Sequence, residues 1–235
     1  MNPTFFVNLG PIKLRQIVDY ISADIVGIDL NTKFNEFVGI DKIKDKENAI
    51  SFVYENSQDK LELPKKTNLI ISKKEKDKYS EFNNLILVDN VQEAVAKLSK
   101  LFYRDINDKD LKQHNHDQVG DECHISKSAI LKKGVIIGKN STIKDGVVIN
   151  NNCIIGENSL IEENAVVSNA LIGDNVRIGR NTSIGQPGFG FAIKNFSNHN
   201  VYHLGRVILQ SNVSIGSNCC IDRGSFGDTI IGENT

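Results

Sequence analysis

Residues 135–149 read VIIGKNSTIKDGVVI, and within this stretch an aliphatic residue returns at every sixth position. The same spacing runs unbroken from Val119 to Val167, and it resumes over 172–184 and 209–221. A period of six matches neither the 3.6-residue period of an amphipathic helix nor the two-residue alternation of a strand. A fixed repeat of this kind indicates a solenoid, in which each repeat stacks on its neighbours.

A second column of small or β-branched residues precedes each aliphatic residue by two positions, as Val135 precedes Ile137 and Cys153 precedes Ile155. Residues i and i−2 of a strand face the same side, so each hexapeptide supplies one large and one small inward side chain. Glycine or asparagine recurs between the strands and suits tight corners. Three strands and three corners would close a coil of about eighteen residues. We therefore expect a parallel β-helix over 119–235, interrupted by a loop at 186–206.

The overall composition excludes two classes of protein. The 28 Lys plus Arg residues nearly balance the 29 Asp plus Glu residues, which argues against a nucleic-acid-binding protein. No stretch is long and apolar enough for a transmembrane segment, and the first twenty residues do not read as a signal peptide. We expect a cytoplasmic protein.

The four cysteines show neither CxxC spacing nor the density of a disulfide scaffold, so we expect free thiols. Cys123, Cys153 and Cys219 fall in the small inward column, whereas Cys220 points outward. His114 and His116 precede Cys123-His124 in a cluster that resembles zinc ligands, but Cys123 faces the core. We therefore predict no metal and no cofactor.

The first half predicts a small α+β domain over 1–108, joined by a linker at 109–118. Apolar spacing favours a helix over 12–21, with Pro11 in its first turn, and a second helix capped by Asn90 with Glu93 three residues on. Apolar runs predict strands at 50–54, 68–71 and 85–88, and the lysine-rich stretch 73–78 is expected to be a solvated loop. No dinucleotide or P-loop motif occurs here.

Two places in the repeat are candidates for substrate binding. The loop contains Gly-Phe-Gly-Phe at 188–191, so Phe189, Gly190 and Phe191 combine aromatic surface with a backbone that a ligand can approach. The alternative is that both phenylalanines fold onto the β-helix. Asp222 and Arg223 precede an irregular step in the repeat, and their alternative is a surface ion pair.

Four segments occur in a fixed order on the repeat: the Gly-Phe-Gly-Phe loop, His-Leu-Gly-Arg-Val at 203–207, Ile-Asp-Arg-Gly at 221–224 and Asp-Thr-Ile-Ile-Gly at 228–232. Together they resemble the UDP-3-O-(3-hydroxyacyl)glucosamine N-acyltransferases of lipid A biosynthesis. The resemblance implies a left-handed β-helix, a homotrimer, and transfer of a 3-hydroxyacyl chain from acyl carrier protein to the 2-amine of a UDP-3-O-acylglucosamine.

The resemblance also implies individual roles. The family carries a uridine-binding domain before its repeats, and Ile50-Ser51-Phe52-Val53 matches its strand, so Phe52 is expected to stack on uracil. Asn56 fits the family's amide contact with a one-residue shift, and we expect Tyr54 to belong to the strand rather than to replace the family's second ring. His203, Asp222 and Arg223 lie in matched segments and are expected to contact substrate.

The family's catalytic histidine follows Ile-Asp-Asn-x-[VC]-x-Ile-Ala-His, a motif that this sequence does not contain. By alignment that histidine would lie beyond Thr235, and neither His124, His199 nor His203 replaces it by position. We therefore expect a chain truncated in mid-coil, with no catalytic residue of its own and inactive alone. Two other interpretations stay open: a non-catalytic β-helix that acts as a binding or scaffold module, and another hexapeptide sugar acyltransferase.

Overall fold

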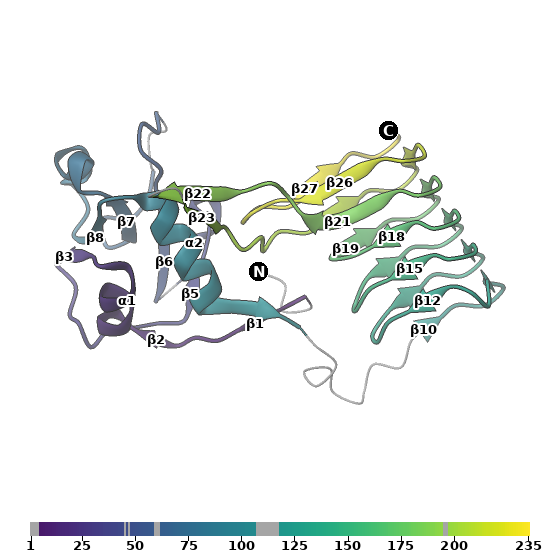
Figure 1. Cartoon of the computed structure of the whole chain (residues 1–235), viewed down its shortest axis with the longest axis horizontal. Coiled ribbons are helices and arrows are strands. Elements are labelled where there is room, and N and C mark those ends of the chain that lie inside the picture. Colours follow the sequence, from purple (N-terminus) through teal and green to yellow (C-terminus); the bar gives the residue numbers. More distant parts are fainter. Residues whose placement is uncertain (1–4, 45, 47, 59–61, 107–117, 195–196) are drawn as a thin grey trace. The chain divides into compact units, whose positions relative to one another are not determined.

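The computed structural model describes residues 5–44, 46, 48–58, 62–106, 118–194 and 197–235 (Figure 1). These residues form two compact units. The first unit holds residues 8–104 together with 190–202, and the second holds the remaining described residues. His114 and His116, with most of the expected linker, lie outside the described residues. No helix among the described residues is long and apolar enough to cross a membrane.

The first unit is built on a five-stranded sheet with the order β3-β8-β7-β6-β5. Strands β5 to β8 are parallel in chain order, and β3 pairs antiparallel with β8 at one edge. The predicted strands at 50–54, 68–71 and 85–88 are confirmed with small shifts of their ends. The bounds are β3 Asp24–Val26, β5 Glu36–Phe37, β6 Ala49–Phe52, β7 Asn68–Ser72 and β8 Asn84–Val88.

Two helices accompany the sheet, α1 (Leu14–Ile21) and α2 (Val91–Phe102). The predicted cap of α2 is confirmed, because the backbone N–H of Glu93 donates to Asn90 Oδ1 at 3.0 Å. The predicted start of the first helix is wrong by two residues. Ile12 and Lys13 form strand β2, which pairs with β4 (Lys33–Phe34), and ladder pairing there takes the place of a first helical turn.

The lysine-rich stretch 73–78 is not an irregular loop, which corrects the prediction. It forms most of a 3₁₀ helix, η2 (Lys73–Tyr79), while a shorter one, η1, covers Ile40–Lys42. Lys73 Nζ lies 2.9 Å from a carboxylate oxygen of Asp24 and 3.4 Å from one of Asp89. Tyr79 at the end of η2 is buried in the apolar cluster beside β7 and β8. Two short strands complete this half of the chain, β1 (Phe6–Asn8) and β9 (Tyr103–Asp105).

The second unit is a parallel β-helix of three sheets, as the repeat predicts. Paired residues such as Ile137 and Ile155 stand one coil of eighteen residues apart, and the five-residue step after Val167 shortens one coil to seventeen. We name each face by its first strand. The β10 face holds β10 Gln118–Val119, β13 Ile136–Ile137, β16 Ile154–Ile155, β19 Ala170–Ile172, β24 Val207–Leu209 and β27 Thr229–Ile231.

The other two faces each hold five strands. The β11 face holds β11 His124–Ile125, β14 Thr142–Ile143, β17 Leu160–Ile161, β20 Arg177–Ile178 and β25 Ser214–Ile215. The β12 face holds β12 Ile130–Leu131, β15 Val148–Ile149, β18 Val166–Val167, β21 Ser183–Pro187 and β26 Cys220–Arg223. Across the inserted loop the register is kept, since Leu171 pairs with Ile208.

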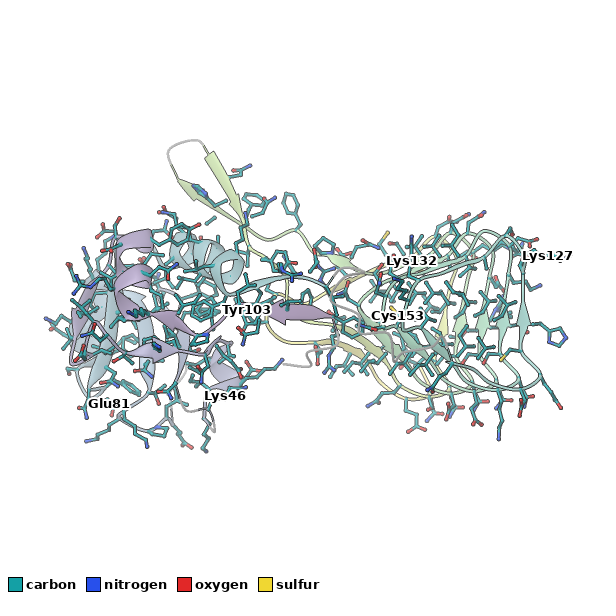
Figure 2. The ribbon with its side chains drawn as sticks, turned by 90° about the horizontal axis from the view of Figure 1, so that it is seen from below. Lys46, Glu81, Tyr103, Lys127, Lys132 and Cys153 are labelled. Atoms are coloured by element: carbon teal, nitrogen blue, oxygen red, sulfur yellow. The ribbon has the colours of Figure 1, made fainter. Side chains whose placement is uncertain are left out.

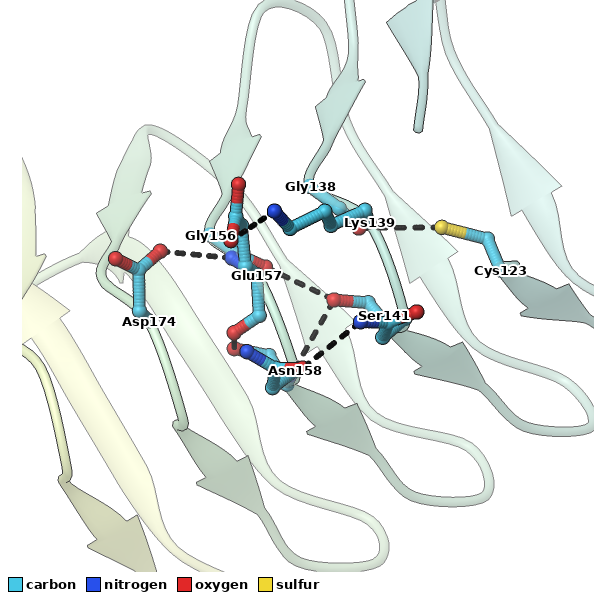
Figure 3. Close-up of polar contacts among 10 residues, drawn as sticks. Cys123, Gly138, Lys139, Ser141, Gly156, Glu157, Asn158 and Asp174 are labelled. Carbon is cyan, nitrogen blue, oxygen red and sulfur yellow. Dashed lines mark hydrogen bonds and ion pairs between the residues drawn. The ribbon is translucent and has the colours of Figure 1, made fainter. Parts of the chain in front are cut away.

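Small polar residues of the inward column satisfy the corners of the coils. Figure 3 shows Cys123 Sγ 3.1 Å from the carbonyl oxygen of Gly138, one coil further on, and Ser141 Oγ donating to Gly156 O at 2.9 Å. The corners also contain asparagines with positive φ, which amide hydrogen bonds link from coil to coil, for example Asn140 Nδ2 to Asn158 Oδ1 at 3.2 Å.

The inserted loop is a β-hairpin of the first unit. Strands β22 (Phe191–Lys194) and β23 (Ser197–Asn200) pair antiparallel and pack beside α2 (Figure 1). The backbone N–H of Tyr202 donates to Ser99 Oγ on α2 at 3.1 Å. The chain therefore leaves the β-helix to complete the first unit and then returns.

Burial makes one thiol inert. Cys153, labelled in Figure 2, is fully buried, and this burial raises the pKa of its thiol to about 12, whereas Cys220 is exposed. At about pH 8 we expect a disulfide reagent to modify Cys220 in the folded protein and to leave Cys153 unmodified, because only the thiolate reacts. Mass spectrometry of the digested adduct measures this. The C220S variant is the control, and modification of Cys153 before unfolding would contradict the assignment.

Candidate functional site

The predicted site residues divide between the two units. Phe52, Asn56, Gly190 and Phe191 belong to the first unit. Phe189, His203, Asp222 and Arg223 belong to the second. The Gly-Phe-Gly-Phe segment is thus where the chain passes from one unit to the other. Each group is described within its own unit.

Arg223 is the best-defined polar residue of the second unit. Its side chain is only 8% exposed, so the alternative of a surface ion pair is wrong for this residue. Its guanidinium donates to the carbonyl oxygens of Gly185 at 2.8 Å and His203 at 3.2 Å, and to Asn169 Oδ1 at 3.3 Å. Phe6 stacks on it with the ring centroid 5.7 Å from Cζ. Asp222, the neighbouring carboxylate, is exposed.

A polar pocket of about 350 Å³ lies beside Arg223 at the carboxyl ends of the β12-face strands. One wall is a ladder in which each step crosses one coil: Asn150 Nδ2 donates to Ser168 Oγ at 2.6 Å, and Gln186 Nε2 donates to the same oxygen at 3.2 Å. Phe5 and Asp105 line the opposite side. Amides, a guanidinium and a carboxylate suit a polar ligand, and among the described lining residues there is no histidine to act as a general base.

His203 and Phe189 have opposite exposures. His203 is 5% exposed and presents its carbonyl oxygen to Arg223, so its first role is to hold that guanidinium. Phe189 is 94% exposed, so the alternative that both phenylalanines fold onto the β-helix is wrong for Phe189. Phe191 begins β22 and is half-buried in the first unit.

Sequence reasoning missed the ion pair between Arg206 and Asp228. Asp228 Oδ1 accepts the backbone N–H of Arg206 at 2.8 Å and its Nε–H at 3.1 Å, while Oδ2 accepts Nη2 at 2.6 Å. Beside this pair, the backbone N–H of Gly205 donates to Gly224 O at 3.0 Å, and a Cβ at Gly205 would lie 1.8 Å from Gly227 O. The available signal was that Arg206 and Asp228 both lie in the quoted segments.

In the first unit, β6 ends at Phe52, which is 7% exposed and packs 5.4 Å from Phe37 between ring centroids. Tyr54 lies beyond the strand, so the expectation that it is a strand residue is wrong. It is 40% exposed, and its ring meets that of Phe52 edge to face at 5.1 Å. Partial burial raises the pKa of its hydroxyl above the ordinary value for tyrosine. Tyr54 is therefore the accessible ring of this pair.

Asn56 follows the aromatic pair in a left-handed conformation, with φ 63°. Its backbone N–H donates to Glu75 Oε1 at 3.1 Å. The residue is exposed, so its side-chain amide is open to solvent. Three buried side-chain oxygens at the end of β7 and in η2 have no hydrogen-bond partner among the described residues: Ser72 Oγ, Glu75 Oε2 and Tyr79 Oη.

No group of three or more His, Cys, Asp and Glu side chains that could hold a metal ion occurs in the described part of the chain. The predicted cysteine positions agree with the structure: Cys153 is buried, Cys123 and Cys219 are partly buried, and Cys220 is exposed.

A segment of the chain is similar in sequence to known enzymes. UDP-3-O-acylglucosamine N-acyltransferase of Caulobacter vibrioides is 53% identical over 51 residues, which is 22% of this chain and 15% of that enzyme. Over this segment the chain is similar to enzymes named UDP-3-O-acylglucosamine N-acyltransferase. Enzymes of the same name from Rhizobium rhizogenes and Maricaulis maris are 51% and 47% identical over 51 residues, again 22% of this chain and 14% and 15% of theirs. The match thus spans about one seventh of the relatives' length.

A family model described as the GMPPB C-terminal domain matches residues 115–221, which hold most of the repeat together with the inserted loop at 186–206. Among solved structures, the acetyltransferase domain of PglB from Neisseria gonorrhoeae, in complex with acetyl coenzyme A, is 11% identical. That comparison covers 81% of this chain and 94% of the domain with a TM-score of 0.25, and we draw no argument from it.

The ion pair of Arg206 with Asp228 should contribute measurably to the free energy of unfolding. Asp228→Ala should lower the free energy of unfolding by about 2 kcal/mol, because it leaves a largely buried guanidinium and a backbone N–H without their acceptor. Glu157→Ala, which breaks an exposed ion pair with Lys139 on the same β-helix, should cost less than about 0.5 kcal/mol. Guanidinium unfolding of both full-length variants tests this, and equal costs would contradict it.

Proposed function

We propose that the chain is part of a cytoplasmic N-acyltransferase of lipid A biosynthesis. The enzyme would move a 3-hydroxyacyl chain from acyl carrier protein to the 2-amine of UDP-3-O-(3-hydroxyacyl)glucosamine. The observation that carries the proposal is the 53% identity, over 51 residues, to an enzyme named for this acceptor. The parallel β-helix supports it, together with the contacts that join residues 205–206 to residues 224–228.

The acceptor's uridine binds, in this proposal, at the carboxyl edge of the first unit's sheet. Phe52 and Tyr54 supply aromatic surface for the base, and Asn56 supplies an amide at the end of a turn that Glu75 holds in place. An exposed aromatic ring beside a surface amide suits a nucleoside, which has both a ring face and polar edges.

Amide formation needs a base that removes the proton of the attacking amine and a donor that stabilises the oxyanion of the thioester. The described histidines do not supply the base in this proposal: His203 is buried beneath Arg223, His124 lies on an outer strand of the β11 face, and His199 lies in the hairpin. The described residues therefore contribute substrate binding and assembly. We expect no acyl transfer by this chain alone, and turnover at a normal enzymatic rate would contradict that assignment.

The aromatic pair gives the test of uridine binding. Tyr54→Leu should weaken the binding of uridine about tenfold, because it removes the exposed ring that the base would contact, and Phe52→Leu should weaken it less, because Phe52 is buried and supports that ring. Calorimetric titration of the full chain measures the dissociation constant. Tyr20→Leu is the control, since it removes an equally exposed ring from α1 of the same unit. Unchanged binding in both variants, with the fold intact by circular dichroism, would overturn the placement of uridine.

Assembly into a homotrimer is the second part of the proposal, and two faces of the β-helix support it. The β10 face carries an outward aliphatic column that is exposed or half-buried: Ile136, Ile154, Leu171, Ile208 and Ile230. The β12 face carries a shorter column: Ile130, Val148 and Val166. A closed ring uses two different surfaces of each subunit, and these two apolar faces suit that arrangement.

The third face supplies a matched control, because its outward residues are largely polar: His124, Thr142, Leu160, Arg177 and Ser214. Ile136→Glu should convert the trimer to monomers, since it places a charge in the apolar column. Thr142→Glu, on the next strand of the same coil, should leave the trimer intact. Light scattering coupled to size-exclusion chromatography measures the mass. A monomeric parent chain, or equal effects of the two substitutions, would contradict the proposal.

A further inference from the structure

A second site in the first unit lies at the ends of the parallel strands that are opposite to Phe52. A pocket of about 560 Å³ opens there, at the amino ends of the parallel strands. Ala49, Asn68 and Asn84, the first residues of β6, β7 and β8, all line it. Its volume is in the range of small-molecule sites. The contacts proposed for uridine follow the other ends of the strands, so this pocket is not required for them.

The charged side chains of the pocket are mostly cationic. Lys44, Lys46 and Lys66 line it, against one carboxylate, Asp29. Lys46, labelled in Figure 2, is neutralised by Glu36 at 2.5 Å. Lys44 and Lys66 form no ion pair with any residue that the structure describes. They come from segments 22 residues apart in sequence and both line this pocket.

The polar lining is held in place before any ligand arrives. Asn84 Nδ2 donates to Asn68 Oδ1 at 2.9 Å and to Lys66 O at 3.0 Å, and Asn68 Nδ2 donates to Ala49 O at 3.0 Å. These bonds tie the three strand ends together and fix the backbone that carries Lys66. A lining that is already ordered loses little conformational entropy on binding.

Gly27, which also lines the pocket, lies beside Asn84 in a bend where φ is +72°. A Cβ at this position would lie 1.9 Å from Asn83 O, so only glycine allows the two backbone segments to meet. Beyond the bend, Thr32 and Asn48 add a hydroxyl and an amide, while Phe34 contributes an apolar surface. The pocket therefore combines cations at its mouth with groups that can hydrogen-bond hydroxyls.

We propose that this pocket binds a small phosphorylated sugar, with Lys44 and Lys66 on the phosphate and Thr32, Asn48 and Asn84 on the hydroxyls. Lysine ammonium groups bind phosphate as mobile point charges, and neutral amides and hydroxyls suit a sugar ring. The site is separate from the uridine contacts and would stand even if those were wrong.

The test titrates the full chain with glucose 1-phosphate and with inorganic phosphate by calorimetry. Glucose 1-phosphate should bind more tightly, because only the sugar reaches the amides and hydroxyls. The double variant Lys44→Ala/Lys66→Ala should weaken its binding at least about tenfold, since it removes two charge-assisted contacts. Both lysines are exposed, so the fold should be unaffected.

The control double variant, Lys65→Ala/Lys100→Ala, removes the same charge from exposed positions of the same unit that do not line the pocket. It should bind as the parent chain does. The proposal is overturned if Lys44→Ala/Lys66→Ala binds normally, if the control loses affinity equally, or if inorganic phosphate and glucose 1-phosphate bind alike. Binding of uridine, which carries no phosphate, measured on the Phe52 and Tyr54 variants, tests the other site independently.

Discussion

Coil-to-coil backbone hydrogen bonding is the constraint on which the second unit depends. Each coil donates to and accepts from its neighbours in parallel register, as when Ile136 N–H donates to Cys153 O and Gly138 N–H to Ile155 O. The register holds only if every coil places one large and one small residue inward at equivalent positions. The six-residue period follows from this requirement, and so do the positive-φ asparagines at the corners.

The inserted hairpin interrupts the β-helix, and contacts between 203–207 and 221–228 fix the place where the chain returns. After residues 190–202 have left the β-helix, the chain must return to pair β24 with β19 in the original register. Asp228 holds Arg206 at the point of return, and Gly205 passes so close to Gly227 that no side chain fits between them. The segments 203–207 and 221–228, which carry the sequence resemblance, therefore also hold the chain in place where it returns from the inserted hairpin.

The fold of the repeat could be predicted because its signal is periodic and every coil repeats the same evidence. The first half offered less. Its apolar runs predict the buried strands correctly, but apolar spacing places Ile12 in a helix, because nothing local shows that Ile12 pairs with Phe34. The apolar run also places Tyr54 in a strand, because it cannot show where ladder pairing stops. The burial of Arg223 depends on Asn169 and Gly185, which are far away in sequence.

Neighbouring strands stay in register although the length of chain between them varies. A five-residue step follows Val167, Leu171 lies 37 residues before its partner Ile208, and Ile208 lies 22 residues before its partner Ile230. The β-helix therefore counts coils and not residues: extra chain can leave at a corner and return there without disturbing the coils on either side. An insertion at a corner therefore leaves the outward side chains of the flanking coils at equivalent places on their faces.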